Sequence, residues 1–197
     1  MIIPRYFIIN KPYDMLSQFV SEKQGILLGD IDFTFPEGIH AVGRLDKQSE
    51  GLLILTTNKK VTRLLFQDAT PHKRTYLVKA KNNVSEERLQ QLRLGIKIRI
   101  KGGGHYTTTS CEVSIVKEPA GLFKRINAPA EYPPHTWLLI TITEGKFHQV
   151  RKMLAAIHHR CQRLIRVSIE DIILGDLQPG DVKEIEEADF FRLLKIK

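Results

Sequence analysis

The chain carries, at residues 136–157, the stretch Thr136-Trp137-Leu138-Leu139-Ile140-Thr141-Ile142-Thr143-Glu144-Gly145-Lys146-Phe147-His148-Gln149-Val150-Arg151-Lys152-Met153-Leu154-Ala155-Ala156-Ile157. Its first part, 136–143, is apolar, of strand length and rich in β-branched residues. Glu144-Gly145-Lys146 then predicts a turn. Beyond it, apolar residues recur at helical spacing, at Val150, Met153, Leu154 and Ile157. The stretch therefore predicts a buried strand, a turn and a helix.

Other segments extend this pattern of strands joined by short turns. Further strands are predicted at Tyr6–Asn10, Leu52–Thr57, Thr75–Lys81, 96–101 and 111–115, a short helix at 61–65, and a second helix that Ser85 caps and Gly95 ends. The proline-bearing stretch 119–134 predicts an irregular connection. Together these elements predict an α+β domain with a mixed, mainly antiparallel central sheet and helices packed around it.

Composition and charge restrict the class of protein. The 197 residues give room for one domain, and 42% are hydrophobic, which is typical of a globular protein. No apolar run is long enough to span a bilayer and no signal peptide is evident, so we expect a cytoplasmic protein without a membrane partner. The net charge of +8 favours a polyanionic partner such as RNA or DNA, although simple solubility also explains it.

The basic residues are concentrated in one segment. Six cations lie between residues 144 and 167, namely Lys146, Arg151, Lys152, Arg160, Arg163 and Arg166, and acidic residues predominate from Glu170 onward. Such segregation favours a localised basic surface, with a solvated helix face as the alternative. Cys111 and Cys161 form no Cys-x-x-Cys pair, and His158, His159 and Cys161 lack a second ligand pair. We therefore expect no metal site and no disulfide.

Three segments carry candidate chemistry. The first is Gly43-Arg44-Leu45-Asp46-Lys47-Gln48-Ser49-Glu50-Gly51-Leu52-Leu53, where an active-site turn and a salt-bridged structural turn are both possible. The second is Arg74-Thr75-Tyr76, whose tyrosine also suits a half-buried strand position. The third is the turn and basic helix at 144–153. Each segment alone is weak evidence for function.

Together, and in this order, the three segments resemble the RsuA-type pseudouridine synthases. Asn10-Lys11-Pro12 matches the same family, as do Leu164-Ile165-Arg166 and the run from Leu174 to Gly180. The resemblance covers about residues 7–182. It implies a single pseudouridine synthase catalytic domain over 1–197, with a smaller lobe at about 1–68, a larger lobe at about 69–197 and a catalytic cleft between the two lobes.

Two departures from the family pattern refine this resemblance. Asn10 lies so close to the start that we expect no S4-type RNA-binding domain, and the spelling from Lys11 to Phe19 is similar to that of the RluE branch, which modifies large-subunit ribosomal RNA. Arg74 stands where the family often has lysine, and it keeps the positive charge. The expected function is therefore isomerisation of a specific uridine to pseudouridine in ribosomal RNA, with 23S rRNA as the expected substrate.

The resemblance implies a role for each matched residue. Asp46 is the catalytic carboxylate, Arg151 the cation beside it, and Tyr76 the residue that stacks on the base and accepts a proton from it. Arg44 contacts the RNA duplex, and the expected RNA-binding residues also include Lys146, His148, Gln149, Lys152, Arg163 and Arg166. For Phe147 we expect packing. Because the reaction involves neither redox change nor group transfer, no cofactor is expected.

Two other functions use the same residues differently. An N-glycosidase would break the same bond and release the base, and a ribosome-assembly factor would use only the basic surface. Isomerisation leaves the mass of the RNA unchanged, which separates it from base loss. The carboxylate Asp46 argues against pure binding, because a carboxylate repels phosphates. We further expect a monomer.

Overall fold

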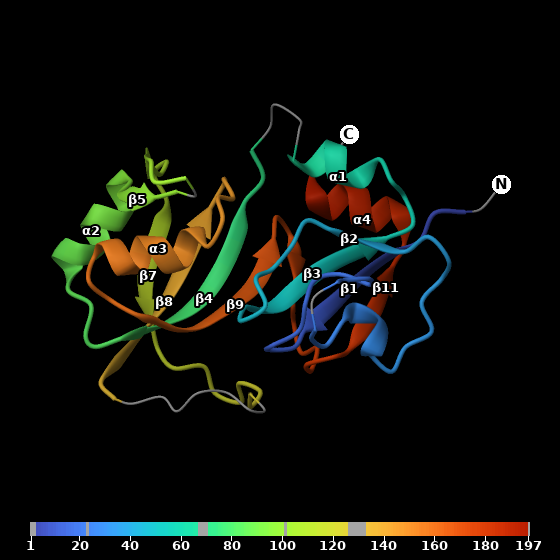
Figure 1. Cartoon of the computed structure of the whole chain (residues 1–197), viewed down its shortest axis with the longest axis horizontal. Helices are drawn as coiled ribbons and strands as arrows, with labels where there is room; N and C mark the ends of the chain where they lie inside the picture. Colours follow the sequence, from blue (N-terminus) through green and yellow to red (C-terminus); the bar gives the residue numbers. More distant parts are fainter. Residues whose placement is uncertain (1–2, 23, 67–70, 101, 126–132, 197) are drawn as a thin grey trace. The chain divides into compact units, whose positions relative to one another are not determined.

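The computed structural model describes residues 3–22, 24–66, 71–100, 102–125 and 133–196. The chain folds into two compact units, which are described separately below (Figure 1). Unit 1 takes Met1–His72, Phe123–Ala128 and Arg166–Lys197, and unit 2 takes Lys73–Leu122 and Pro129–Ile165. The first boundary lies near the one expected at residue 68. Residues 166–197 belong to unit 1, whereas the expected larger lobe includes them, and the assignment of the two lobes stays a prediction.

Unit 1 is built on a sheet in which β1 lies between two antiparallel partners. Its elements are β1 (Tyr6–Lys11), the 3-10 helix η1 (Leu28–Asp30), β2 (His40–Val42), β3 (Glu50–Thr56), α1 (Val61–Phe66), β10 (Ile172–Ile173), β11 (Val182–Ile185) and α4 (Glu187–Leu194). The strand β1 pairs with β3 and with β11, and β2 pairs with the other edge of β3. Every residue of β1 and β3 is buried, which explains why both read as nearly continuous apolar runs.

The C-terminal helix α4 completes the core of unit 1. The ring of Phe190, on α4, lies 4.5 Å from the ring of Tyr6 on β1, and Phe191 packs edge-on against the same tyrosine. The Tyr6 hydroxyl donates to Glu187 at the start of the helix. These contacts join the two ends of the chain within one core.

Unit 2 is built on β4 (Arg74–Lys81), β8 (His135–Ile142) and β7 (Glu112–Val116), which pair antiparallel in that order. A small hairpin joins β5 (Lys97–Arg99) to β6 (His105–Thr107). The helices are α2 (Glu86–Leu94) and α3 (Gln149–Ala156), both visible in Figure 1. The strand β9 (Cys161–Ile169) begins in unit 2 and ends in unit 1.

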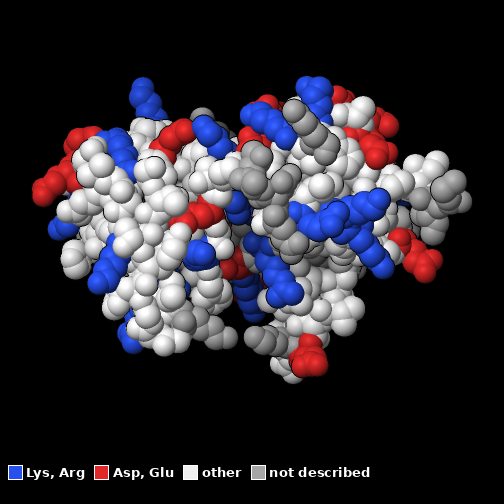
Figure 2. All heavy atoms as spheres, turned by 90° about the horizontal axis from the view of Figure 1, so that it is seen from above, with Lys and Arg blue, Asp and Glu red and all other residues white. Residues whose placement is uncertain are grey.

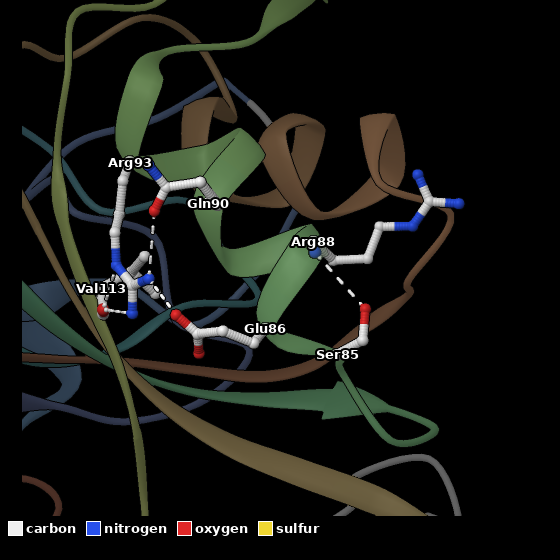
Figure 3. A network of polar contacts seen from close by, with 6 residues as sticks. All are labelled: Ser85, Glu86, Arg88, Gln90, Arg93 and Val113. Carbon is white, nitrogen blue, oxygen red and sulfur yellow. Dashed lines mark hydrogen bonds and ion pairs between the residues drawn. The ribbon is translucent and has the colours of Figure 1, made fainter.

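The helix α2 follows the predicted start and end signals. The side chain of Ser85 accepts a hydrogen bond from the Arg88 N–H, and Gly95 follows the last residue of the helix (Figure 3). Arg93 pairs with Glu86 and donates to the carbonyl of Val113 on β7, which fixes the helix against the sheet. Leu89 and Leu92 are buried as predicted.

The α+β class and the mainly antiparallel pairing are confirmed. The predicted strand at 111–115 is present as β7, although Ile115 is 53% exposed. The structure adds β6, β9, β11 and α4, which the sequence patterns did not predict. The predicted connection at 119–134 has no regular structure up to residue 125, and 126–132 lie outside the described residues. In the part of the chain that is described, no helix has the length and apolar character to cross a bilayer.

Candidate active site

Asp46 lies in a tight turn of unit 1 between β2 and β3. Its backbone carbonyl accepts a hydrogen bond from the N–H of Ser49 at 2.9 Å, and β3 begins at the next residue, Glu50. The preceding Leu45 is only 6% exposed, so it anchors the turn in the core while Asp46 stays partly exposed. The carboxylate is therefore held close to a buried strand end and remains accessible.

Gly43 starts this segment in a conformation that suits glycine. Its φ is 73°, in the left-handed region that L side chains rarely adopt. A Cβ at this position would also meet the ring of Phe66 at 2.7 Å. Two structural features therefore favour glycine at the start of the Gly-Arg-Leu-Asp motif: the backbone conformation and the ring packed on it.

Ser17 fixes the backbone next to Asp46. The Ser17 Oγ donates to the carbonyl of Leu45 at 2.8 Å and accepts from the N–H of the same residue at 3.0 Å. Ser17 is 5% exposed, so both backbone groups would lie in a dry environment without it. Leaving a buried backbone group unsatisfied costs about 1–3 kcal/mol. Ser17 therefore holds the turn at the residue adjoining the carboxylate.

Lys11 ties the same turn to the end of β1. Its ammonium donates to the carbonyls of Pro12 and Met15, each at 2.8 Å, and more weakly to that of Lys47 at 3.4 Å. Lys11 is fully buried, and this burial lowers the pKa of its side chain to about 7, against the opposing effect of the nearby Glu50 and Asp46 carboxylates. A buried lysine, which carries its positive charge below about pH 7, therefore lies within electrostatic reach of Asp46.

Further charges are buried around the start of β3. Glu50 is fully buried and pairs with Arg125 at 3.8 Å, and the Arg125 guanidinium lies 5.1 Å from the centre of the Tyr13 ring. Arg166, at 3% exposure, donates from Nε to the carbonyl of Leu52 at 2.7 Å. Unit 1 thus surrounds the base of the Asp46 turn with cations that contact protein groups.

Tyr76 and Arg151 both belong to unit 2. Tyr76 lies on β4 opposite Ile140 of β8 and is 9% exposed, so most of the side chain packs in the sheet and little of it is open. Arg151 lies in the first turn of α3 and is partly exposed. The predicted helix face is confirmed, since Val150, Met153 and the other two apolar positions are buried.

The turn before α3 is organised by the Glu144 carboxylate. It accepts hydrogen bonds from the Tyr106 hydroxyl, from the N–H of Thr109 at 3.0 Å and from the Gln149 side chain at 2.6 Å. The amide oxygen of Gln149 in turn accepts from the N–H of Lys146 at 2.8 Å. Glu144 and Gln149 therefore brace the Glu-Gly-Lys-Phe-His-Gln segment from inside.

Arg74 braces this turn from the side. Its Nη2 donates to the carbonyl of Thr143 at 2.8 Å, and a Cβ on Gly145 would lie 2.9 Å from the Arg74 Nη1. The residue that replaces the usual family lysine thus holds the backbone between β8 and α3.

The predicted RNA-binding residues divide into an exposed and a buried group. Arg44 and Lys146 are exposed, and His148 and Lys152 are partly exposed. The buried group comprises Gln149 at 4%, Arg163 at 7% and Arg166 at 3% exposure. Figure 2 shows lysine and arginine atoms in several separate groups on the face in view. The six cations of the basic segment are therefore not one surface, because β9 buries two of them.

Phe147 differs from the expectation of packing. Its side chain is 64% exposed, and its ring stacks on the His148 ring with centroids 3.8 Å apart. The chain segment before α3 therefore presents an aromatic pair to solvent beside Lys146 and Lys152.

Comparison with known proteins decides the family. Residues 5–156 match the family model described as RNA pseudouridylate synthase, a span that includes Asp46, Tyr76 and Arg151. The chain belongs to this family. The expected enzyme class, an RNA pseudouridine synthase, is confirmed.

Named relatives place the chain within the family. It is 39% identical over 185 residues to ribosomal large subunit pseudouridine synthase E of Vibrio parahaemolyticus, which covers 92% of this chain and 74% of the relative. The protein of the same name from Xanthomonas axonopodis is 35% identical, covering 87% and 89%. Ribosomal small subunit pseudouridine synthase A of Vibrio parahaemolyticus is 28% identical, covering 94% and 73%. The likeness to the RluE branch is confirmed.

Solved structures show the same pseudouridine synthase fold. A crystal structure of a pseudouridylate synthase matches with a TM-score of 0.79 at 23% identity, covering 98% of this chain and 75% of the other. Human RNA pseudouridylate synthase domain containing 1 matches with a TM-score of 0.57 at 16% identity, covering 92% and 78%.

Sequence reasoning missed the residues that hold the pseudouridine synthase motifs in place. Ser17 and Lys11 were noted only as parts of sequence motifs that match the family, and Gln149 was expected to bind RNA. For Lys11 the available signal was its place just after the apolar run 6–9, because a lysine that is buried at the end of a core strand needs partners. Nothing in the sequence pairs Ser17 with Leu45.

Proposed function

We propose that this protein isomerises one specific uridine to pseudouridine in large-subunit ribosomal RNA, with Asp46 as the catalytic carboxylate. The likeness to the large-subunit enzyme of Vibrio parahaemolyticus, at 39% identity over 92% of the chain, is the observation that carries the substrate. The family match spans the three proposed catalytic residues.

In the proposed reaction, the bond from ribose C1′ to base N1 breaks, the base turns, and C1′ joins base C5. Asp46 either attacks the sugar carbon or removes a sugar proton, and both routes require an ionised carboxylate. A neighbouring cation favours the charged form. We assign this role to Arg151, and the buried Lys11 near Asp46 in unit 1 supports the same charge state.

Tyr76 is proposed to stack on the base and to accept the proton that leaves C5. The ordinary pKa of tyrosine makes the phenol a poor base, so the proton transfer depends on help from its surroundings. The small exposed part of Tyr76 suits contact along one edge or face of a base, because the remainder of the ring is packed in the sheet.

RNA contact is proposed for the exposed group, Arg44, Lys146, His148 and Lys152. The side chains of Arg44, Lys146 and Lys152 are cations that can contact phosphates, and taking the target base out of its stack costs a few kcal/mol that such contacts offset. Gln149, Arg163 and Arg166 are left out of this set, because burial leaves them little surface to offer.

Replacement of Asp46 by Asn tests the proposal. The amide keeps the size of the side chain and removes both the charge and the reactive oxygen. We expect a folded protein that binds RNA and forms no detectable pseudouridine on a large-subunit RNA transcript. Asp32→Asn, at an exposed position of the same unit, is the matched control and should retain full activity. Substantial activity of a well-folded Asp46→Asn protein would refute the assignment.

The same assay separates the alternative functions. Product RNA of unchanged mass that contains pseudouridine supports isomerisation, whereas loss of one base would identify an N-glycosidase. RNA that is bound but chemically unchanged by the wild-type protein would favour an assembly factor.

The proposal extends to location and assembly. Ribosomal RNA as substrate implies action in the cytoplasm, and we expect a monomer. Cell fractionation and sedimentation of the purified protein test these two points.

A further inference from the structure

Phe147 is the most exposed aromatic ring among the exposed large hydrophobic residues of the described chain. Its side chain is 64% exposed, against 39% for Phe66 and 37% for Phe33. Single exposed apolar residues are common and need no explanation. Phe147 is different because a second ring, His148, lies parallel to it at 19° with centroids 3.8 Å apart.

Two lysines of this segment lie over aromatic rings. The Lys152 Nζ lies over the Phe147 ring, 5.3 Å from its centre, and the Lys146 Nζ lies over the Tyr106 ring, 4.7 Å from its centre. An exposed aromatic ring with lysines close by is the combination that proteins use for unpaired nucleotides, because the ring stacks on the base and the cations contact the phosphates.

The turn holds the pair in a fixed position. His148 adopts a left-handed conformation with φ of 55°, which is uncommon for a residue other than glycine and is found where the surroundings over-determine the backbone. Glu144 and Gln149 supply those surroundings through the hydrogen bonds at 2.6 and 2.8 Å. A ring pair that is already ordered loses little conformational entropy on binding.

We propose that Phe147 and His148 form a stacking platform for one unpaired base of the RNA substrate, other than the uridine that reacts. The reacting base is assigned to Tyr76, so the platform holds a neighbouring nucleotide. Lys146 and Lys152 contact the phosphates on either side of it. The inference rests on the proposed function, since it takes its ligand from there.

Charge favours RNA over a second copy of the chain as the occupant. A two-fold contact through Phe147 would bring Lys146 and Lys152 of one copy against the same residues of the other, and like charges repel. An RNA strand brings phosphates to these lysines.

The test is fluorescence titration with a 12-nucleotide uridine oligomer that carries one 2-aminopurine, whose emission falls when it stacks on a ring. Phe147→Leu keeps an apolar side chain without the ring, and Phe147→Trp keeps a ring. We expect Phe147→Leu to weaken binding by about 5- to 150-fold, the equivalent of about 1–3 kcal/mol per stacked base, and to abolish the quenching. Phe147→Trp should restore both.

Two controls define the effect. Ile115→Ala, at a 53% exposed position on β7 of the same unit, should leave binding and quenching unchanged. The salt dependence of binding should be the same for Phe147→Leu as for the wild type, because no phosphate contact is removed. If the Phe147→Leu protein binds the RNA oligomer as tightly as the wild type does, the stacking platform is refuted. A change of oligomeric state in that variant without a change in RNA affinity would also refute it.

Pseudouridine formation by the wild type on a ribosomal RNA transcript separates this inference from the proposed function. If the wild type forms no pseudouridine while the Phe147-dependent quenching persists, the proposed function fails and the platform stands. If pseudouridine forms and Phe147→Leu has no effect on binding, the platform fails and the function stands.

Discussion

In unit 1, Lys11 and Arg166 are buried around the Asp46 turn and donate to backbone carbonyls, whereas in unit 2 Lys146 and Lys152 lie at the surface near aromatic rings. The first pair meets protein oxygens, and Lys11 also lies close enough to the buried Glu50 and the candidate carboxylate for their charges to act on its pKa. The second pair remains available to phosphates.

From this difference we propose that positive charge has two separate uses in this enzyme. A buried cation acts over a short range in a medium of low dielectric, so it stabilises a nearby carboxylate strongly. A surface cation acts on a mobile polyanion and is screened by salt. The predictions below separate the two uses, from the largest expected effect to the smallest.

Replacement of Arg151 by Met asks whether the cations of unit 1 are sufficient for Asp46. We expect single-turnover pseudouridine formation to fall about 10²- to 10³-fold, the usual cost of removing one preorganised charge partner at a reacting group. Arg160→Met, at an exposed position of the same unit, should retain wild-type rates. Near-normal rates for Arg151→Met would mean that Lys11 and its neighbours alone keep Asp46 charged.

Replacement of Lys11 by Met tests the role of the buried lysine through the pH dependence of stability. Burial lowers the pKa of Lys11 to about 7, far below its value in the unfolded chain, so between about pH 7 and 10 the unfolded state binds more protons. The wild type should therefore gain stability as pH rises through this window, by at most about 1.4 kcal/mol per pH unit. Below pH 7 this contribution becomes constant.

In the Lys11→Met protein this gain should be missing. Urea unfolding of both proteins at several pH values between 6 and 10 gives the difference in unfolding free energy directly. Parallel curves for the two proteins would show that Lys11 keeps an ordinary pKa and does not act as a buried group.

Replacement of Lys152 by Gln tests whether a surface lysine contacts an RNA phosphate. If Lys152 contacts one phosphate, the slope of log K against log salt should decrease by about 0.7 for single-stranded RNA or about 0.9 for a duplex. Lys117→Gln, at another exposed lysine of unit 2, should leave the slope unchanged. A decrease of the same size in both variants would indicate diffuse attraction without a defined contact.

Local patterns predicted the frame of the fold and the positions of the motifs. The helix α3 was predictable because its apolar residues recur at 3.6 spacing, and α2 because Ser85 and Gly95 mark its ends. The burial of Arg163 and Arg166 was missed, because the segment was interpreted by its charge and no strand was predicted there. Residues 163–166 of β9, which include both arginines, are buried without interruption.

Long-range polar contacts escaped the sequence patterns for a different reason. Ser17 satisfies Leu45 across 28 residues, and neither residue has a local signal for the other. The short β11 lacks an apolar run, and its pairing depends on β1 at the far end of the sequence. The helix α4 did carry a local signal, since the buried Phe190 and Leu194 are four residues apart, and this signal was missed.

The return of residues 166–197 to unit 1 affects the order in which the protein forms during synthesis. The strand β1 leaves the ribosome early, but its edge partner β11 and the covering helix α4 follow after the whole of unit 2. At elongation rates of about 5–20 residues per second, this delay is on the order of ten seconds. During that interval the nascent chain carries an uncovered, strongly apolar strand pair while unit 2 is already able to fold. We therefore expect unit 1 to be the part that depends on chaperones and to close only after translation ends.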